Sequence, residues 1–405
     1  MPEITYNPYE GVDWSIAGIF STDFHTHCWK TEDTEPEMIQ WHATEPAPTP
    51  ADGERTGYNF YGYSADGHDS PRDQDTAEQG GELYGFWGDV EERDPVLHRE
   101  CNAENQDPEA LDCVAYRCRE HVGGELEHVH DLFGKDYPAP GEIEGNDSRQ
   151  GAVGVIIQND GHAVIAHPQE YRQLGDEDPT EYSAVFDEFP ASDRFSGTDC
   201  HPEDYPEFAE YDRTDGLLGV EVIGCKGHFF DGWDTLLDYY TDRDPIFGYP
   251  ASDLQSAMSI GDESMRFETA IVTHPDNIDA SDQEGSRETI RKCFEKGCAV
   301  GIVRSSWDDD TENSPTVPII NSIDVDGNTI TIDATDAGEI RWISSGETVE
   351  TGETITITDD EAPYVRAELE SNPDGMMFTQ PIGVSTDLTA TIGDATLGDI
   401  TFGGN

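Results

Sequence analysis

Two histidines stand one residue apart at the end of an apolar run, in the segment GIFSTDFHTHC over 18–28. Side chains at positions i and i+2 of a strand point to the same side, so His25 and His27 would present two imidazoles to one point. Converging imidazoles are what a divalent transition metal needs as ligands. The pair therefore predicts a metal site, although two structural histidines could share this spacing.

Four later segments hold histidines and carboxylates where an apolar stretch ends. In parallel α/β folds the carboxyl ends of the strands form the functional face, so such residues would meet at one site. Each alone could equally be a solvated acid or a core histidine. The segments are GYNFYGYSADGHDS (57–70), GGELEHVHDLFG (123–134), HAVIAHP (162–168) and FGYPASDLQS (247–256). Their candidate residues are Asp66, His68, Asp69, Glu125, Glu127, His128, His130, His167 and Asp253.

The elements that would position these residues alternate between strand-like and helix-like stretches up to about residue 305. The segment 151–168 predicts a helix, a glycine turn and a buried strand, and LLGVEVIG (217–224) predicts another buried strand. RETIRKCFEKG (287–297) predicts an amphipathic helix that Gly297 ends. This alternation indicates an α/β fold with parallel strands. Acidic stretches near 44–57 and 71–124 are interpreted as long inserted loops.

The pattern changes after a polar linker at 305–318. Apolar and polar residues then alternate, and Asp-Gly and Gly turns separate the runs, which is typical of antiparallel hairpins. We therefore expect three units: residues 1–310, a small antiparallel β-sandwich at 316–382, and a β-rich tail or assembly arm at 383–405.

The charge of the chain excludes some classes of function. The 405 residues include 87 acidic and 22 basic side chains, for a formal net charge of −65. This excludes nucleic-acid binding by a basic surface and a basic membrane-surface protein. Such an excess of acid favours a high-salt environment, where mutual repulsion is screened. Neither a membrane-spanning segment nor a signal peptide is visible, so we expect a cytoplasmic location. None of the eight cysteines forms a C-x-x-C pair.

Five segments resemble, in order, the signature segments of the PHP (polymerase and histidinol phosphatase) superfamily of metal-dependent hydrolases. They are FHTHC, SADGHD, HAVIAHP, LLGVEVIG and ASDLQ, and the later YVRAEL and FTQPI resemble the β-domain of the carbaryl hydrolase-like branch. The resemblance covers roughly residues 15–382. It implies a distorted (β/α)7 PHP-type barrel in residues 1–310 with a small C-terminal β-sandwich domain, and two or three divalent metal ions (Zn, Mn or Fe).

The resemblance also implies roles for individual residues. Glu127 and His128 are near-equal alternatives to Glu125 and His130. Apart from the resemblance, the place of Glu221 inside the apolar strand 217–224 suggests that it could orient a metal ligand without binding the metal itself. The implied metal ligands are His25, His27, His68, Glu125, His167 and Asp253, and the implied catalytic residues are Asp66 and His130.

Two departures from the family's pattern leave two functions open. Gln255 stands where the closing motif has a histidine, and the second motif is stretched over 64–68. One function is a phosphoesterase, or an ester or amide hydrolase, acting on a small anionic substrate. The alternative is a non-catalytic scaffold or binding module with a degenerate metal site, part of a larger surface or virion assembly. The C-terminal β region could then form a homo-oligomer.

Overall fold

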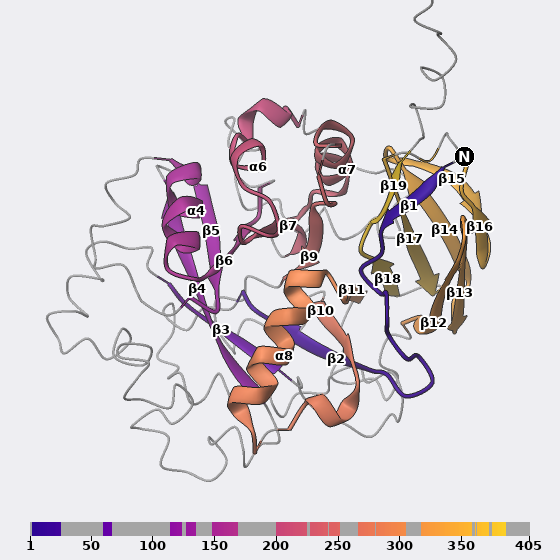
Figure 1. Ribbon diagram of the computed structural model, residues 1–405, viewed down its shortest axis with the longest axis horizontal. Helices are drawn as coiled ribbons and strands as arrows, with labels where there is room; N and C mark the ends of the chain where they lie inside the picture. Colours follow the sequence, from indigo (N-terminus) through magenta and orange to yellow (C-terminus); the bar gives the residue numbers. More distant parts are fainter. Residues whose placement is uncertain are drawn as a thin grey trace, which may run out of the picture.

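A computed structural model gives the fold (Figure 1). For β3 (Phe60–Asp66) and β4 (Val114–Gly123) it gives the path of the backbone. No helix in the described part of the chain is long and apolar enough to cross a membrane. The described residues are 2–25, 60–66, 114–123, 127–134, 148–168, 200–224, 227–241, 243–251, 266–279, 281–304, 317–358, 361, 363–371 and 375–385.

The first part of the chain forms one mixed sheet. Four of its ladders are parallel (β2–β3, β3–β4, β6–β7 and β7–β9), and five are antiparallel (β10–β11, β10–β2, β4–β5, β5–β6 and β7–β8). The other strands of this part are β2 (Gly18–Asp23), β5 (Glu127–Leu132), β6 (His162–Ile165), β7 (Leu217–Gly224), β8 (Gly227–His228), β9 (Phe247–Pro250), β10 (Arg266–Thr273) and β11 (Ala299–Arg304).

This sheet corrects two expectations from the sequence. The strands are not all parallel, because only three residues separate β4 from β5, which is too few for the crossover that a parallel pair needs. The stretch 71–124 is not an insertion throughout, because residues 114–123 form β4 in the middle of the sheet. Alternation of apolar and charged residues in VAYRCREHVG suits a strand, but the acidic composition around it hid that signal.

Helices pack around this sheet, and the two that the sequence predicted near 151 and 287 are present. The Ser148 hydroxyl caps the first by accepting a hydrogen bond from the Gly151 N–H at 3.2 Å. Gly297 ends the second with φ +65°, and a Cβ there would lie 2.4 Å from the Phe247 ring. The helices are α4 (Arg149–Gln158), α6 (Glu207–Glu210), α7 (Phe230–Tyr239) and α8 (Gln283–Lys296), with single 3₁₀ turns at Pro202–Asp204 and Pro275–Asn277.

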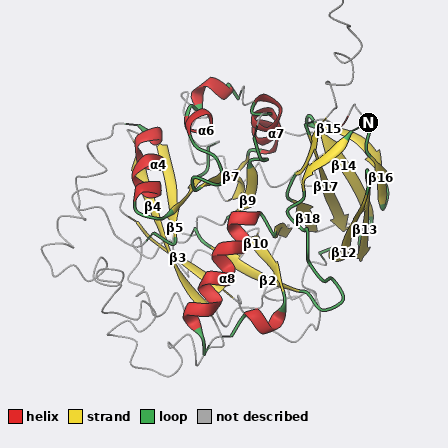
Figure 2. Ribbon diagram, in the orientation of Figure 1, coloured by secondary structure: helices red, strands yellow, loops and turns green. Residues whose placement is uncertain are grey.

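The C-terminal part consists of antiparallel strands, as the sequence predicted, and Figure 2 shows the helices confined to the other part of the described chain. Ile330 and Ile332 of β13 are fully buried and share one core with Trp342 and Leu369 of the facing layer. One layer holds β12 (Ile319–Asp326), β13 (Thr329–Thr335) and β16 (Thr354–Thr356). The other holds β14 (Glu339–Ser344), β15 (Glu347–Thr351), β17 (Tyr364–Ser371), β18 (Gly375–Thr379) and β19 (Ile382–Ser385).

The two parts share one continuous sheet. β11 pairs with β18, and β1 (Glu3–Tyr6), the first strand of the chain, pairs with β19 near its other end (Figure 1). A buried ion pair adds to this connection, because Arg366 of β17 donates to Asp234 of α7 through Nε at 2.9 Å and Nη2 at 2.8 Å. The Tyr364 hydroxyl donates to the same carboxylate at 2.7 Å. The boundaries of the three expected units stay a prediction.

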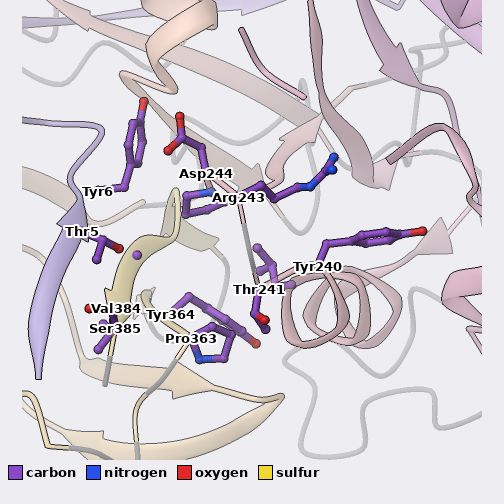
Figure 3. A pocket seen from close by; sticks show the side chains of 13 residues that line it. Thr5, Tyr6, Tyr240, Thr241, Arg243, Asp244, Pro363, Tyr364, Val384 and Ser385 are labelled. Atoms are coloured by element: carbon purple, nitrogen blue, oxygen red, sulfur yellow. The ribbon is translucent and has the colours of Figure 1, made fainter. Parts of the chain in front are cut away.

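A pocket of about 330 Å³ lies along this junction, between β1, the end of α7 and β19 (Figure 3). Its charged groups have partners in the fold. Asp244 pairs with Arg213, and Arg243 donates to the Tyr211 carbonyl at 2.7 Å. These side chains therefore hold the wall of the pocket together.

The Gln380 side chain forms with β9 the two backbone hydrogen bonds that a neighbouring strand would otherwise form. The Gly248 N–H donates to Gln380 Oε1 at 2.9 Å, and Gln380 Nε2 donates to the Gly248 carbonyl at 2.7 Å. The Gln380 N–H donates in turn to the Tyr9 hydroxyl at 2.9 Å, which donates to the Ala299 carbonyl at 2.8 Å. Because all of these groups are buried, the amide satisfies backbone groups that could not reach water.

We expect Gln380→Leu to lower the free energy of unfolding by about 2–5 kcal/mol, because it leaves the Gly248 N–H and C=O buried without partners. Urea titration in molar KCl measures the change. Glu347→Gln, on the exposed strand β15, is the control and should change the free energy by less than about 0.5 kcal/mol. Equal stabilities for the two variants would contradict this role for Gln380.

A second cluster of charged groups fixes α8 against the start of β6. Glu295 Oε1 lies 2.9 Å from His162 Nε2 and 3.0 Å from Arg291 Nε, and Arg291 also pairs with Asp160 at 3.4 Å. The hydrogen bond from His162 is the main cause that lowers the pKa of Glu295 from 4.5 to about 2; partial burial opposes the shift and Arg291 reinforces it.

This shift predicts a pH-dependent contribution to stability. The folded state holds the Glu295 carboxylate below its ordinary pKa, so the stabilisation is present above about pH 4.5 and is lost as the pH falls toward about 2. The stability gap between the wild type and Glu295→Gln should therefore narrow between pH 6 and pH 3 in urea titrations. Glu288→Gln, which removes an exposed pair with Lys292, should show a small gap at both pH values. A gap for Glu295→Gln that does not change with pH would contradict the prediction.

Candidate metal centre

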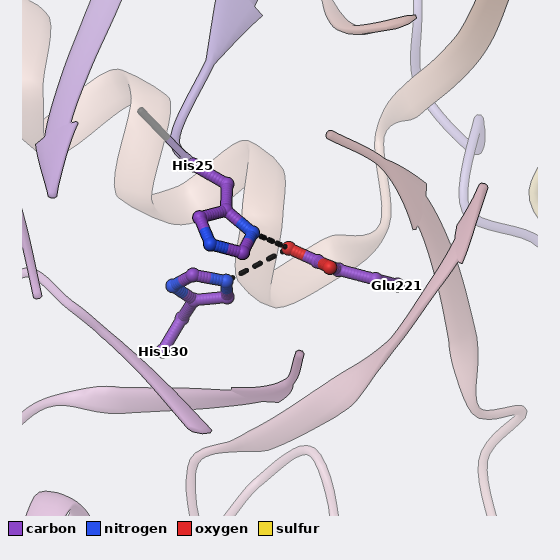
Figure 4. A group of neighbouring side chains, drawn as sticks. All are labelled: His25, His130 and Glu221. Carbon is purple, nitrogen blue, oxygen red and sulfur yellow. Dashed lines mark hydrogen bonds and ion pairs between the residues drawn. The ribbon is translucent and has the colours of Figure 1, made fainter. Parts of the chain in front are cut away.

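A buried carboxylate stands at the centre of the candidate site. Glu221 lies within β7, a strand whose residues are all buried, and its side chain is 2% exposed. Its Oε1 lies 2.6 Å from His25 Nδ1 and 2.7 Å from His130 Nε2 (Figure 4). Its Oε2 accepts a hydrogen bond from the His167 N–H at 2.7 Å. A buried charge is costly unless it is paired, and this one gathers partners from three other segments.

The sheet explains how these segments meet. His25 follows the end of β2 by two residues, and His167 follows the end of β6 by two. His130 lies within β5, directly opposite Val164 of β6, and β6 pairs in turn with β7. At the end of β6 the backbone of His167 takes φ +21°, a conformation that is uncommon for a residue with a side chain.

Four buried imidazoles form one cluster, and two of them contact the carboxylate directly. The ring centroids of His25 and His130 are 4.2 Å apart, and those of His25 and His167 are 5.3 Å apart with the rings nearly parallel. The ring of His128, on the same strand as His130, lies 4.9 Å from that of His167. Phe24 packs edge-on against His130 at 5.3 Å and forms an apolar wall.

The electrostatics favour an ionised carboxylate in this cluster. Burial raises the pKa of Glu221, but the positive charges and hydrogen bonds of His25 and His130 together lower it further, so the net pKa lies well below its ordinary value. The ligand atoms of these three residues lie within 4.8 Å of one another. Two imidazole nitrogens and a carboxylate oxygen are a donor set that suits Zn, Mn or Fe.

This geometry is consistent with two arrangements around a metal. Glu221 could be a direct ligand together with His25 and His130. It could also hold the Nδ1–H of His25, so that the opposite nitrogen Nε2 faces the metal, as carboxylates behind ligating histidines commonly do. The second arrangement is the role that the sequence suggested for Glu221.

The structure places some of the sequence-predicted residues in this cluster. His25, His130 and His167 lie together, and His128, the alternative to His130, lies beside them. Asp66 ends β3, whose side chains are outside the described part of the structure, as is that of Glu127. His27, His68, Glu125, Asp253 and Gln255 lie outside the described residues, so their roles stay predictions.

The sequence indicated the central position of Glu221 only weakly. A single acid within the otherwise apolar run LLGVEVIG was the available signal. Because apolar residues flank it on both sides of the run, the strand was expected to be buried on both faces, and the Glu221 side chain could then not reach water. The sequence alone did not show that it binds both His25 and His130.

Comparison with known proteins gave one structural likeness. No family model matches the chain, and no curated protein matches it. A solved structure of a two-domain protein from Bacteroides vulgatus, described as containing a predicted PHP-like metal-dependent phosphoesterase, is similar with a TM-score of 0.45 and 12% sequence identity. The match covers 94% of this chain and 98% of that one.

Glu221→Gln separates the two arrangements. If Glu221 is a direct ligand, the variant should lose the metal, because a neutral amide is a poor ligand for such an ion. If Glu221 orients His25, metal affinity should fall by about 10–100-fold. Titration of the metal-free protein with Zn²⁺ by calorimetry in molar KCl measures the affinity. Glu203→Gln, at an exposed 3₁₀ turn, is the control. Wild-type affinity in the Glu221 variant would contradict both arrangements.

Proposed function

We propose that this protein is a metal-dependent hydrolase of the PHP type that cleaves a phosphoester, or an ester or amide bond, in a small anionic substrate. The single observation that carries the proposal is the buried Glu221 carboxylate with two imidazole nitrogens within 2.7 Å of one of its oxygens. A structural core gains little from such a cluster, since replacing buried ion pairs by apolar residues is often neutral or stabilising.

The histidines of the cluster would bind metal ions at two positions. His25 and His130 would hold one metal ion, with Glu221 balancing its charge. His167 and His128, whose rings are adjacent, would supply imidazoles to a second position. When bound, divalent ions supply an activated water and positive charge for the developing oxyanion. Phe24, which is fully buried, would exclude bulk water from one side.

The resemblance to the PHP superfamily supplies the rest of the proposal. Residues 1–310 would form a distorted (β/α)7 barrel, with His27, His68, Glu125 and Asp253 completing a site for two or three ions. Asp66 would accept and donate the protons that are transferred during hydrolysis. The positive charge of the metals would reverse the local field, so a net charge of −65 does not prevent binding of an anion at this site.

Metal content and hydrolysis test this proposal together. Protein purified in molar KCl should carry about two bound transition-metal ions by elemental analysis. His25→Ala and His130→Ala should lower that content and reduce hydrolysis of a chromogenic phosphodiester by about 100-fold or more, because strong electrostatic contacts to the transition state are lost. His201→Ala removes an exposed histidine and should change neither quantity.

The contrary outcomes are distinct. Wild-type protein that stays metal-free after incubation with Zn²⁺, Mn²⁺ and Fe²⁺ would overturn the proposal and favour the non-catalytic scaffold. A protein that binds metal without hydrolysing the diester would overturn phosphodiester cleavage, and assays of a carboxylic ester and an amide would then test the remaining reactions.

A further inference from the structure

The end of α8 brings two cysteines together. The Cys298 N–H donates to the Cys293 carbonyl at 2.8 Å, and the Gly297 N–H donates to the Phe294 carbonyl at 3.0 Å. These two bonds and the left-handed Gly297 define a Schellman motif. In such a motif the two residues joined by the bond that spans more of the sequence, here Cys293 and Cys298, are usually in hydrophobic contact. Here both of those positions carry thiols.

The thiols of this pair point at one acceptor. Cys298 Sγ lies 3.2 Å from the carbonyl oxygen of Val272 in β10, and Cys293 Sγ lies 3.9 Å from the same oxygen. Both cysteines are in the thiol form and nearly buried, with 8% of Cys293 and 5% of Cys298 exposed. Two side chains that a tight turn holds against one atom are neighbours in space, although four residues separate them in sequence.

The environment makes the two thiols chemically unequal. The hydrogen bond from Cys293 lowers the pKa of Cys298, with burial opposing it and the positive charge of Lys296 reinforcing it. The same hydrogen bond, together with burial, raises the pKa of Cys293. Cys298 is therefore the better nucleophile of the pair, because the thiolate is the reactive form of cysteine.

We infer that Cys293 and Cys298 form a vicinal dithiol site that closes to an intrachain disulfide by exchange with a low-molecular-weight disulfide. The Cys298 thiolate attacks one sulfur of the reagent and releases the first reagent thiolate. Cys293 then loses its proton to solvent and attacks the Cys298 sulfur, which releases the second reagent thiolate. Two cysteine thiols are oxidised, and one disulfide reagent is reduced to two thiols.

The disulfide would lie next to residues that pack against the candidate metal centre. Phe294, the residue after Cys293, packs edge-on against Phe24 with ring centroids 6.0 Å apart, and Phe24 directly precedes His25. A disulfide across the turn would fix the last turn of α8 to the start of β11. It does not require a bound metal, so it is independent of the proposed hydrolysis.

Peptide mapping of the full chain tests the inference with oxidised glutathione as the probe. Trypsin cleaves after Lys292, Lys296 and Arg304, so the cysteines fall in two peptides, 293–296 and 297–304. Oxidised protein in molar KCl should yield these two as one linked species, lighter by two hydrogens than their sum, which dithiothreitol separates. The linked species should persist in Cys200→Ser and be absent from Cys293→Ser and Cys298→Ser.

A second measurement, of the melting temperature, uses only the wild-type protein, so it does not depend on whether the serine variants fold. Oxidation should raise the Tm of the wild type by a few degrees, with and without EDTA, and dithiothreitol should reverse the rise. Three results would overturn the inference: two unlinked peptides after Cys200 has reacted with the probe, linkage of either cysteine mainly to other cysteines, or linkage that appears only in urea.

Discussion

The structure of the candidate site depends on one constraint, a carboxylate that cannot reach water. Glu221 lies in a strand buried along its whole length, so its charge must be matched by groups that the fold brings to it. The ends of β2 and β6 and the middle of β5 supply His25, His167 and His130. A change in the register of any of these strands would leave a buried charge with too few partners, so the carboxylate selects the pairing of the sheet.

The C-terminal layer that holds β14, β15, β17, β18 and β19 is joined to the site-bearing part by several contacts in addition to the β1–β19 ladder. The β11–β18 ladder extends the sheet, Gln380 completes the outer edge of β9, and Arg366 neutralises Asp234 of α7. The contact at β9 bears on the site, because Tyr249 of the same strand lies directly opposite Glu221. The layer therefore helps to position the strand that flanks the carboxylate.

Local sequence patterns predicted the helices and strands better than they predicted which strands pair with each other. The helices near 151 and 287 and the C-terminal hairpins follow from periodicity and glycine turns, which act within a few residues. The pairing of β1 with β19 joins the two ends of the described chain, and no local pattern records it. Within the site, His25 and His167 were candidates because apolar runs precede them, and His130 was a candidate because it belongs to a second His-x-His pair. Glu221 was difficult to single out as the central residue, because the chain has 87 acids and only packing shows which one is enclosed.

The position of β1 has a consequence for the order of events during synthesis. Its partner, β19, is made some tens of seconds later, at translation rates of about 5–20 residues per second. During that interval β1 and the outer side of β9 are unpaired edges, which other chains could join.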